Sequence, residues 1–431
     1  MKKVLILTYY WPPSGGPGVQ RWLKFVKYLP EQGYEPIIIT VDPAKATYPV
    51  TDETLVNEVP KELEVIRTST REPYGLYKKI SGKKQVPYSG FTNESSKGFF
   101  SKISRFIRGN LFVPDARIGW NSFAVEKAAE IIKKHKIEVL ITTSPPHSTQ
   151  LAGLELKKMF PEIRWIADMR DPWTDIFYYN KMLHLPHVKK KDQKLEKSVL
   201  KSADAIVTVS DYISRIFSEK PGADCKDKVH VITNGYDPDD FMNTDAEPDP
   251  EFFTLAYVGT VSDEYILSGL IDAFKIVKDK LGDKARIKFT GNISNKWKVS
   301  LENTLGNSVY FSGHVNHHEA VAKMQEADML LLVIPDIAQN EGIITGKLFE
   351  YLAASRPVLG IGPKNGDAAE LLKKTKAGEM FSYLDHENIS TFILQYALKE
   401  KKWLPDHDQI HHFSRKKQTE KLIQLMENQQ K

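Results

Sequence analysis

Short apolar runs alternate with longer amphipathic stretches along the whole chain. In the first half the apolar runs have the length of buried strands, at residues 4–8, 36–40, 64–67, 139–143, 165–168, 205–210 and 229–233. The stretches between them space their apolar residues as helices do, as at 19–32, 124–136 and 151–160. Because strands and helices alternate, the pattern predicts a parallel sheet with helices on both faces.

A second series of the same kind follows an acidic, proline-bearing link at residues 245–251. Its apolar runs lie at 254–258, 287–289, 309–311, 329–333 and 358–360. Two such series predict an α/β fold with two Rossmann-like domains that face each other across a cleft. Ligands are then expected beyond the carboxyl ends of the strands. The predicted domains are 1–245 and 246–412, followed by a helical segment at 413–431.

The composition is that of an ordinary globular protein. Of the 431 residues, 41% are hydrophobic and 27% are charged, which excludes a disordered or fibrous chain. The single cysteine, Cys225, cannot form an internal disulfide, so a reducing compartment is expected. No signal peptide is recognisable, and no apolar run approaches the ~20 residues that span a bilayer. The sequence therefore predicts a soluble, cytoplasmic protein.

The net charge of +5 is unevenly distributed. Residues 1–245 carry 37 Lys and Arg against 30 Asp and Glu, a balance of +7, whereas residues 246–431 carry 23 against 25, a balance of −2. The basic half is expected to meet an anionic surface or substrate. No nucleic-acid-binding module is recognisable, so nucleic acid is not expected as a partner.

The segment 71–110 breaks the alternation and holds nine Lys or Arg but only two acids. Within 98–111 the apolar residues recur at helical spacing, while Lys102, Arg105 and Arg108 occupy the other side. Such a helix can lie on an anionic membrane, here the inner face of the plasma membrane. The alternative is a helix docked on its own domain with a solvated basic face.

A glycine-rich loop follows the first predicted strand. Gly15, Gly16 and Gly18 allow positive φ and a close approach of the backbone to a ligand. The helix that starts near Val19 points its first amides to the same place, which suits a phosphate. Arg21 in the first turn would add a charged donor. The alternative is a plain strand-to-helix turn.

A second loop, at 340–350, is more specific. Gly342 and Gly346 free the backbone, and Lys347 stands at a helix start, where it can complement a diphosphate. Glu350 lies one turn further on the same face, where its carboxylate can accept hydrogen bonds from sugar hydroxyls. The spacing is not that of a P-loop, because three rather than four residues separate the glycines. The alternative is an exposed Lys–Glu pair without a role.

Polar residues also follow two strands of the first half. His147 stands after two prolines at one strand end, and Asp168, Arg170 and Asp171 follow the next strand, beside Trp173. Charges at the end of an apolar strand are costly to bury without purpose. The functional interpretation is that they position an acceptor near the reacting carbon. The alternatives are a histidine that satisfies a carbonyl and an Arg–Asp network that only shapes the loop.

Together these motifs resemble glycosyltransferase family 4, whose members have the GT-B fold. The strongest match is Gly-Lys-Leu-Phe-Glu-Tyr-Leu-Ala at 346–353 with Arg-Pro-Val-Leu at 356–359, which is similar to the donor-site helix of that family. Further matches follow in the family's order, at the glycine loop 15–16, at 144–148, at 168–173, at 207–210, at 231–237 and at 257–259. The segment 413–426 is similar to the last helix of the fold, which crosses back to the first domain. The likeness is greatest to bacterial capsule, O-antigen and exopolysaccharide transferases.

The resemblance implies a retaining hexosyltransferase that moves a sugar from a nucleotide-sugar donor to a glycan or lipid-linked acceptor in cell-surface polysaccharide synthesis. It implies no metal and no cofactor, and the histidine-rich patches at 314–318 and 407–412 lack zinc-ligand spacing. Donor contacts are expected at Gly15, Gly16, Arg21, Gly259, Gly342, Gly346, Lys347 and Glu350. Acceptor contacts are expected at Asp168, Arg170, Asp171 and Trp173, and catalytic roles at His147, Asp171 and Lys347.

Two departures from the family pattern leave other functions open. Gly342 occupies the position where many members carry the first glutamate of a Glu-x7-Glu pair, and the loop 259–265 lacks a basic residue. Lys347 is then expected to carry more of the diphosphate charge. The alternatives are a sugar-nucleotide epimerase of the same fold and a non-catalytic binding or scaffold protein. A phosphorylase would need a much longer chain.

Overall fold

The computed structural model describes residues 1–72, 105–107, 109–242 and 246–428. The chain forms two compact units. Unit 1 consists of Met1–Thr233 and Thr419–Lys431, and unit 2 of Asn234–Gln418. The division falls after residue 233, whereas the sequence pattern placed it after residue 245.

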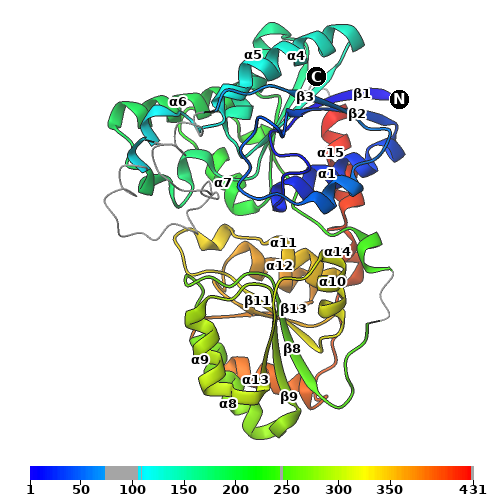
Figure 1. Cartoon of the computed structure of the whole chain (residues 1–431), viewed down its shortest axis with the longest axis vertical. Helices are drawn as coiled ribbons and strands as arrows, with labels where there is room; N and C mark the ends of the chain where they lie inside the picture. The colour runs from blue at the N-terminus through cyan, green and yellow to red at the C-terminus, as the bar shows by residue number, and fades with distance from the viewer. Residues whose placement is uncertain (73–104, 108, 243–245, 429–431) are drawn as a thin grey trace. The chain divides into compact units, whose positions relative to one another are not determined.

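Unit 1 is built on a seven-stranded parallel sheet in the order β3-β2-β1-β4-β5-β6-β7 (Figure 1). Its strands are β1 (Lys2–Leu7), β2 (Tyr34–Val41), β3 (Glu64–Thr68), β4 (Val139–Ser144), β5 (Arg164–Met169), β6 (Ala205–Thr208) and β7 (Val229–Val231). Its helices include α1 (Pro17–Tyr28), α4 (Asn121–His135), α5 (Ser148–Met159), α6 (Pro186–Ser202), α7 (Asp211–Ser218) and most of α15 (Arg415–Glu427). Every strand predicted for the first half is confirmed, within two residues of its predicted ends.

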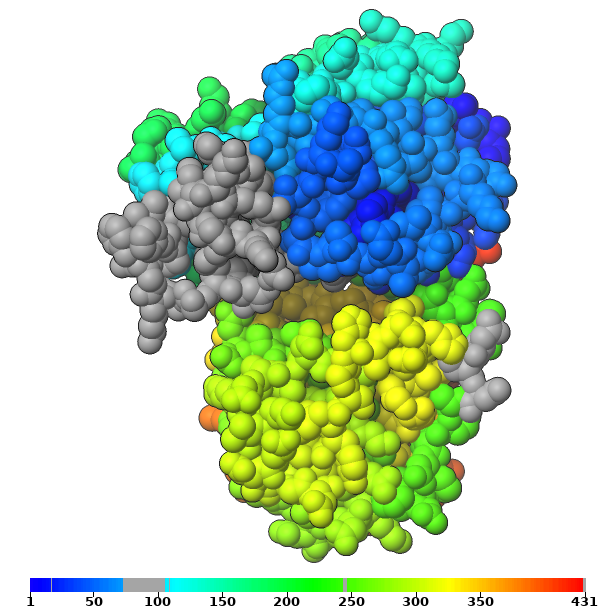
Figure 2. All heavy atoms as spheres, in the orientation of Figure 1, coloured from blue at the N-terminus to red at the C-terminus, as the bar shows by residue number. Residues whose placement is uncertain are grey.

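Helices cover both faces of this sheet because successive strand residues point to opposite sides. Leu5 and Leu7 of β1 join the core beneath α4 and α5. Val4 and Ile6 join the opposite core, to which α1 contributes. The last helix, α15, adds Leu422 to that second core, so its predicted return to the first domain is confirmed. In the space-filling view, side chains close the space between the ribbons of the unit (Figure 2).

Unit 2 repeats the plan with a six-stranded parallel sheet in the order β10-β9-β8-β11-β12-β13. Its strands are β8 (Phe253–Val258), β9 (Ala285–Thr290), β10 (Val309–Ser312), β11 (Met329–Val333), β12 (Val358–Ile361) and β13 (Gly378–Phe381). Its helices are α8 (Ser268–Leu281), α9 (Asn295–Leu305), α10 (His317–Gln325), α11 (Gly346–Ala353), α12 (Asp367–Thr375), α13 (His386–Ala397) and α14 (His407–His411). The sequence missed β13, because Gly378 and the exposed Glu379 leave an apolar run of only two residues.

Candidate functional site

The loops that follow β1, β4 and β5 meet at the carboxyl edge of the unit 1 sheet. Gly16, beside Gly15 in the first of these loops, adopts φ 103°, which favours glycine, and α1 begins directly after it. A Cβ added at Gly18 would lie 2.5 Å from Nη1 of Arg170, so the guanidinium rests on this loop. Arg170 also donates from Nε to the carbonyl of Ser144 at 2.9 Å. The structure therefore brings the first predicted glycine loop together with Arg170.

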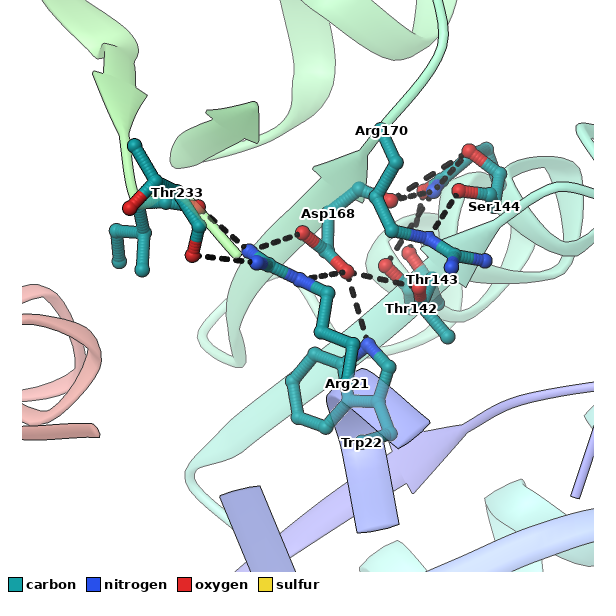
Figure 3. A network of polar contacts seen from close by, with 10 residues as sticks. Arg21, Trp22, Thr142, Thr143, Ser144, Asp168, Arg170 and Thr233 are labelled. Carbon is teal, nitrogen blue, oxygen red and sulfur yellow. Dashed lines mark hydrogen bonds and ion pairs between the residues drawn. The ribbon is translucent and has the colours of Figure 1, made fainter. Parts of the chain in front are cut away.

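Arg21 and Asp168 form a buried ion pair (Figure 3). Each residue is 1% exposed, and Nη2 of Arg21 lies 3.1 Å from Oδ1 of Asp168. Asp168 also accepts hydrogen bonds from Nε1 of Trp22 and Oγ1 of Thr143, each at 2.8 Å. Arg21 donates to two backbone carbonyls just after β7, each at 2.9 Å.

The structure gives Arg21 and Asp168, predicted as ligand contacts, hydrogen-bond partners within unit 1. Period-two alternation places Asp168 on the same sheet face as Ile166, towards α1 and away from solvent. Both side chains are enclosed and hydrogen-bonded by the protein itself. Their network joins α1, β4, β5 and the end of unit 1, which is a structural role.

His147 stacks on Trp173, which comes from the loop after β5. Their ring centroids are 5.1 Å apart and the ring planes differ by 12°. Burial, together with the charges of Arg170 and Lys220, lowers the pKa of His147 to about 3. The Nδ1 atom is buried and has no hydrogen-bond partner in the described part of the chain. At neutral pH His147 is thus an uncharged imidazole that can hydrogen-bond but supplies no positive charge.

Trp173 packs against the ring of His147 and is itself buried. It is 2% exposed, and its Nε1 donates to Oδ1 of Asp192 at 2.9 Å. The hydroxyl of Tyr179 donates to Oδ2 of the same carboxylate at 2.8 Å. Trp173, predicted as an acceptor contact, is thus enclosed in the core of unit 1.

Arg170 and Asp171 are the partly exposed members of the predicted acceptor group. Burial raises the pKa of Asp171, and the neighbouring charge of Arg170 opposes that shift. Together with His147 they form the polar, accessible part of this edge.

In unit 2 the structure brings Lys347 and Gly259 together. Lys347 is the second residue of α11, and Gly259 directly follows β8 with φ 134°. A Cβ added at Gly259 would lie 2.6 Å from Nζ of Lys347. That ammonium donates to the hydroxyl of Tyr257 at 2.6 Å, and burial lowers the pKa of Lys347 to about 8, a shift that Glu350 opposes. The predicted lysine therefore lies against a second glycine, Gly259, whose missing side chain leaves room for the ammonium beside the backbone.

The remaining donor-site candidates lie along the same segment. Gly342 ends a 3₁₀ turn, and Gly346 opens α11 beside open space, since an added Cβ there would meet nothing within 4 Å. Glu350 is partly exposed one turn further on. Burial raises the pKa of its carboxyl, whereas the charges of His317 and Arg415 favour the ionised form.

Two residues that shape these sites were missed from the sequence. Tyr257 was predicted as a strand residue within the family match at 257–259, and nothing in the spacing linked it to Lys347. Asp192 did carry a signal: it lies four residues before Glu196 on a helix otherwise rich in lysine. Acids that share one face of such a helix, and are both buried, indicate an internal network.

Two kinds of feature are absent from the described residues. These residues contain no group of three or more His, Cys, Asp or Glu side chains able to hold a metal ion. Within the same residues, no helix combines the length and apolar character needed to cross a membrane.

Comparisons with known proteins agree with this architecture. Over 257 residues the chain is 24% identical to TuaH of Bacillus subtilis (strain 168), whose name assigns it provisionally as a teichuronic acid biosynthesis glycosyltransferase. That match spans 55% of this chain and 63% of TuaH, which is less than two thirds of its length.

Solved structures match the whole chain at low identity. Sucrose-phosphate synthase from Thermosynechococcus elongatus has a TM-score of 0.61 and 13% identity, with 99% of this chain and 98% of that one covered. Anabaena HepE in complex with UDP has a TM-score of 0.61 and 12% identity, with 98% and 99% covered. These likenesses show the fold, which is the α/β GT-B fold.

The family model described as Glycosyltransferase Family 4 matches residues 18–240, just over half of the chain. That span includes the first helix, the loops after β4 and β5 and the Arg21–Asp168 network. The chain belongs to glycosyltransferase family 4.

Proposed function

We propose that the protein is a glycosyltransferase that moves a hexose from a nucleotide-sugar donor to a glycan or lipid-linked acceptor in cell-surface polysaccharide synthesis. The observation that carries this proposal is the ammonium of Lys347, held over Gly259 at the N-terminus of α11. A cation beside uncovered backbone and a helix N-terminus is a favourable environment for a diphosphate. Family membership, the TuaH match and the UDP bound in HepE support the same assignment.

The chemistry follows from charge. In the transfer, the bond between the anomeric carbon and the diphosphate oxygen breaks, and negative charge develops on the leaving diphosphate. Lys347 and the first amides of α11 would stabilise that charge without a metal ion. Glu350 would accept hydrogen bonds from sugar hydroxyls of the donor. The acceptor oxygen bonds to the same face of the carbon, so that configuration is retained, and its proton passes to a donor phosphate oxygen.

Unit 1 would serve the acceptor through its accessible polar edge. Asp171 and Arg170 would position the acceptor, and Arg170 suits an acceptor that carries phosphate. His147, being neutral, would donate or accept a single hydrogen bond to a sugar. Gly16 would offer its backbone amide beside them, whereas the amide of Gly15 already donates to the carbonyl of Val50 at 3.0 Å.

The proposed membrane contact of the acceptor side involves residues far apart in sequence. Most of the predicted segment 98–111 lies outside the described residues, but Phe106, Ile107 and Leu111 are described and exposed. Asn110 donates to the carbonyl of Leu183 at 3.1 Å and accepts from the amide of Leu185 at 2.7 Å. Both leucines are exposed, at 47% and 39%.

The helix that follows these leucines adds charge. α6 exposes Lys189, Lys190, Lys191 and Lys194, while its acids Asp192 and Glu196 are buried. Exposed apolar side chains beside unneutralised lysines suit an anionic lipid surface, which would hold the protein at the inner face of the plasma membrane.

A donor screen tests the proposal. Nucleoside diphosphate release from a panel of nucleotide sugars, with lipid-linked acceptor present, should identify one donor. Lys347→Ala should lower kcat/KM by about 10²–10³-fold, because it removes a charge that stabilises the transition state. Lys280→Ala, which removes an exposed lysine on α8, should leave it unchanged. Activity should persist in EDTA, and the product should keep the donor configuration by NMR.

One observation favours a second candidate, a non-catalytic binding protein. Gly342 stands where many family members carry a glutamate near the donor sugar. Tight nucleotide-sugar binding without turnover for any donor would support that alternative and contradict the transferase.

A further inference from the structure

The hydroxyl of Tyr257 lies among several hydrogen-bonding groups. Tyr257 is 1% exposed in β8, and its hydroxyl donates to the carbonyl of Thr260 at 2.8 Å and has Tyr265 as a further partner. Because an ammonium can only donate, the hydroxyl oxygen is the acceptor towards Lys347. It accepts from Nζ of Lys347 at 2.6 Å, so the lysine head is tied to the strand rather than to its own helix.

The ring of Tyr257 is itself held in place. It packs against Phe289 of β9, with centroids 5.8 Å apart. Nζ of Lys347 lies 4.3 Å from the centroid of the Tyr257 ring, a distance that the hydrogen bond to the hydroxyl sets. Gly259 leaves room for the ammonium beside its backbone, because an added Cβ would stand 2.6 Å from Nζ.

From these contacts we infer that Tyr257 is a positioning residue for the binding of the donor diphosphate. Tyr257 holds the ammonium of Lys347 over Gly259 before a nucleotide binds. A lysine side chain that is free in solvent loses conformational entropy when an anion fixes it. Because Tyr257 already fixes the side chain of Lys347, binding of the diphosphate does not cost that entropy. The inference rests on the proposed function, in which Lys347 carries more of the diphosphate charge because the loop 259–265 lacks a basic residue.

The titratable groups around the ammonium of Lys347 determine at which pH the lysine loses its charge. Glu350 on α11 raises the pKa of Lys347, and Tyr257 on β8, which itself contacts Tyr265, offers a neutral acceptor. With burial the pKa lies at about 8, so the lysine loses its proton within an accessible pH range. Binding of an anion should therefore weaken as pH rises through 8.

The experiment measures the Kd of UDP for the full chain between pH 7 and 9.5 by calorimetry. Above about pH 7 the terminal phosphate of UDP is largely ionised. The uracil ring begins to lose its N3 proton towards the top of this range, so each Kd is compared with that of Lys347→Arg at the same pH. For the unmodified chain, Kd should rise about tenfold between one pH unit below the midpoint and one above it. Lys347→Arg keeps its charge throughout, and binding by that variant should be independent of pH over this range.

Tyr257→Phe decides the inference. It keeps the ring and removes the acceptor, so the charged lysine is less well satisfied. Binding at pH 7 should weaken about three- to tenfold, and the midpoint should move to lower pH. Tyr351→Phe is the matched control. Its hydroxyl is equally buried and contacts the backbone of Val258, not Lys347. Tyr351→Phe should lower the stability of the protein without moving the midpoint of the change in Kd with pH.

The outcomes separate two failures. If the unmodified chain binds neither UDP nor ADP, GDP, CDP or dTDP tested in its place, the proposed function is overturned and this inference with it. If folded Tyr257→Phe binds with the same pH dependence as the unmodified chain, so that the midpoint of the change in Kd does not move, this inference alone is overturned. If circular dichroism shows that Tyr257→Phe does not fold, 4-fluorophenylalanine at position 257 replaces it. Its fluorine fills the space of the hydroxyl but is a far weaker acceptor and does not titrate. The same downward shift of the midpoint is expected, and an unshifted midpoint would contradict the inference.

Discussion

Single residues at the strand ends of this protein divide into those that face solvent and those that hold the fold together. Asp168 and Asp171 are three positions apart in the same motif, yet one is enclosed by four donors and the other is partly exposed. The sequence identified the motif but could not separate the two roles. Side-chain direction at the last residues of a strand depends on the helix that packs against it, here α1, which contributes Arg21 and Trp22.

A substitution at Asp168 tests its structural role. Asp168→Asn keeps the shape but leaves the guanidinium of Arg21 buried without its counter-charge. The free energy of unfolding should fall by about 3–5 kcal/mol, measured by urea denaturation. Adding Arg21→Met should recover part of that loss, because the uncompensated charge is then gone.

Asp224→Asn serves as the control in the same unit. It breaks the exposed contact with Lys201 at 3.6 Å, where both side chains are more than half exposed. Exposed pairs contribute little, so the denaturation midpoint should not move. Equal losses for the two aspartates would contradict a structural role specific to Asp168.

At the scale of elements, the alternation of apolar runs predicted nearly all of the fold. Every predicted strand is present, and only β13 was missed, because its sequence carries too short an apolar run. The long-range pairings were not predictable. Lys347 and Tyr257 meet because α11 packs on β8, and Asn110 meets Leu183 because the helical residues 109–111 lie beside the loop 183–185. Periodicity fixes which face of an element is buried but not which other element covers it.

The surface formed by the 183–185 loop and α6 carries a prediction at this scale. Leu183→Asp with Leu185→Asp replaces two exposed apolar side chains by charges that repel anionic lipid. Binding to phosphatidylglycerol vesicles, measured by flotation, should weaken at least about tenfold. Leu404→Asp, at a leucine of unit 2 that is 74% exposed, should bind as the unmodified chain does. Equal binding to neutral phosphatidylcholine vesicles would contradict an anionic-lipid surface.

The whole molecule is two sheets of similar design, but only one unit is continuous in sequence. Unit 2 is inserted into unit 1, whose last helix follows it in the chain. α15 adds Leu422, Ile423, Leu425 and Met426 to the core shared with α1. The Nε of Arg164 also donates to the carbonyl of Leu425 at 2.7 Å, which ties the helix to β5.

Unit 1 should therefore depend on α15 for its stability. Leu422→Ala should cost about 2–5 kcal/mol, since Leu422 is 2% exposed and its loss leaves a cavity. Gln424→Ala, on the exposed face of the same helix, should change stability by less than about 0.5 kcal/mol. Hydrogen exchange should locate the effect of Leu422→Ala in the strands of unit 1. Exchange that increases only in unit 2 would contradict this dependence.

The position of α15 also sets an order of events during synthesis. A ribosome that has finished β7 must translate all of unit 2 before it makes the residues that complete unit 1. At about 5–20 residues per second, that interval lasts roughly ten to forty seconds. Throughout it, the sheet face that α15 will cover is open to chaperones. Because Tyr34 of β2 contacts Glu427 at 3.1 Å, the end of α15 lies beside the start of unit 1. A circular permutant that begins with α15 would let unit 1 close before unit 2 is made.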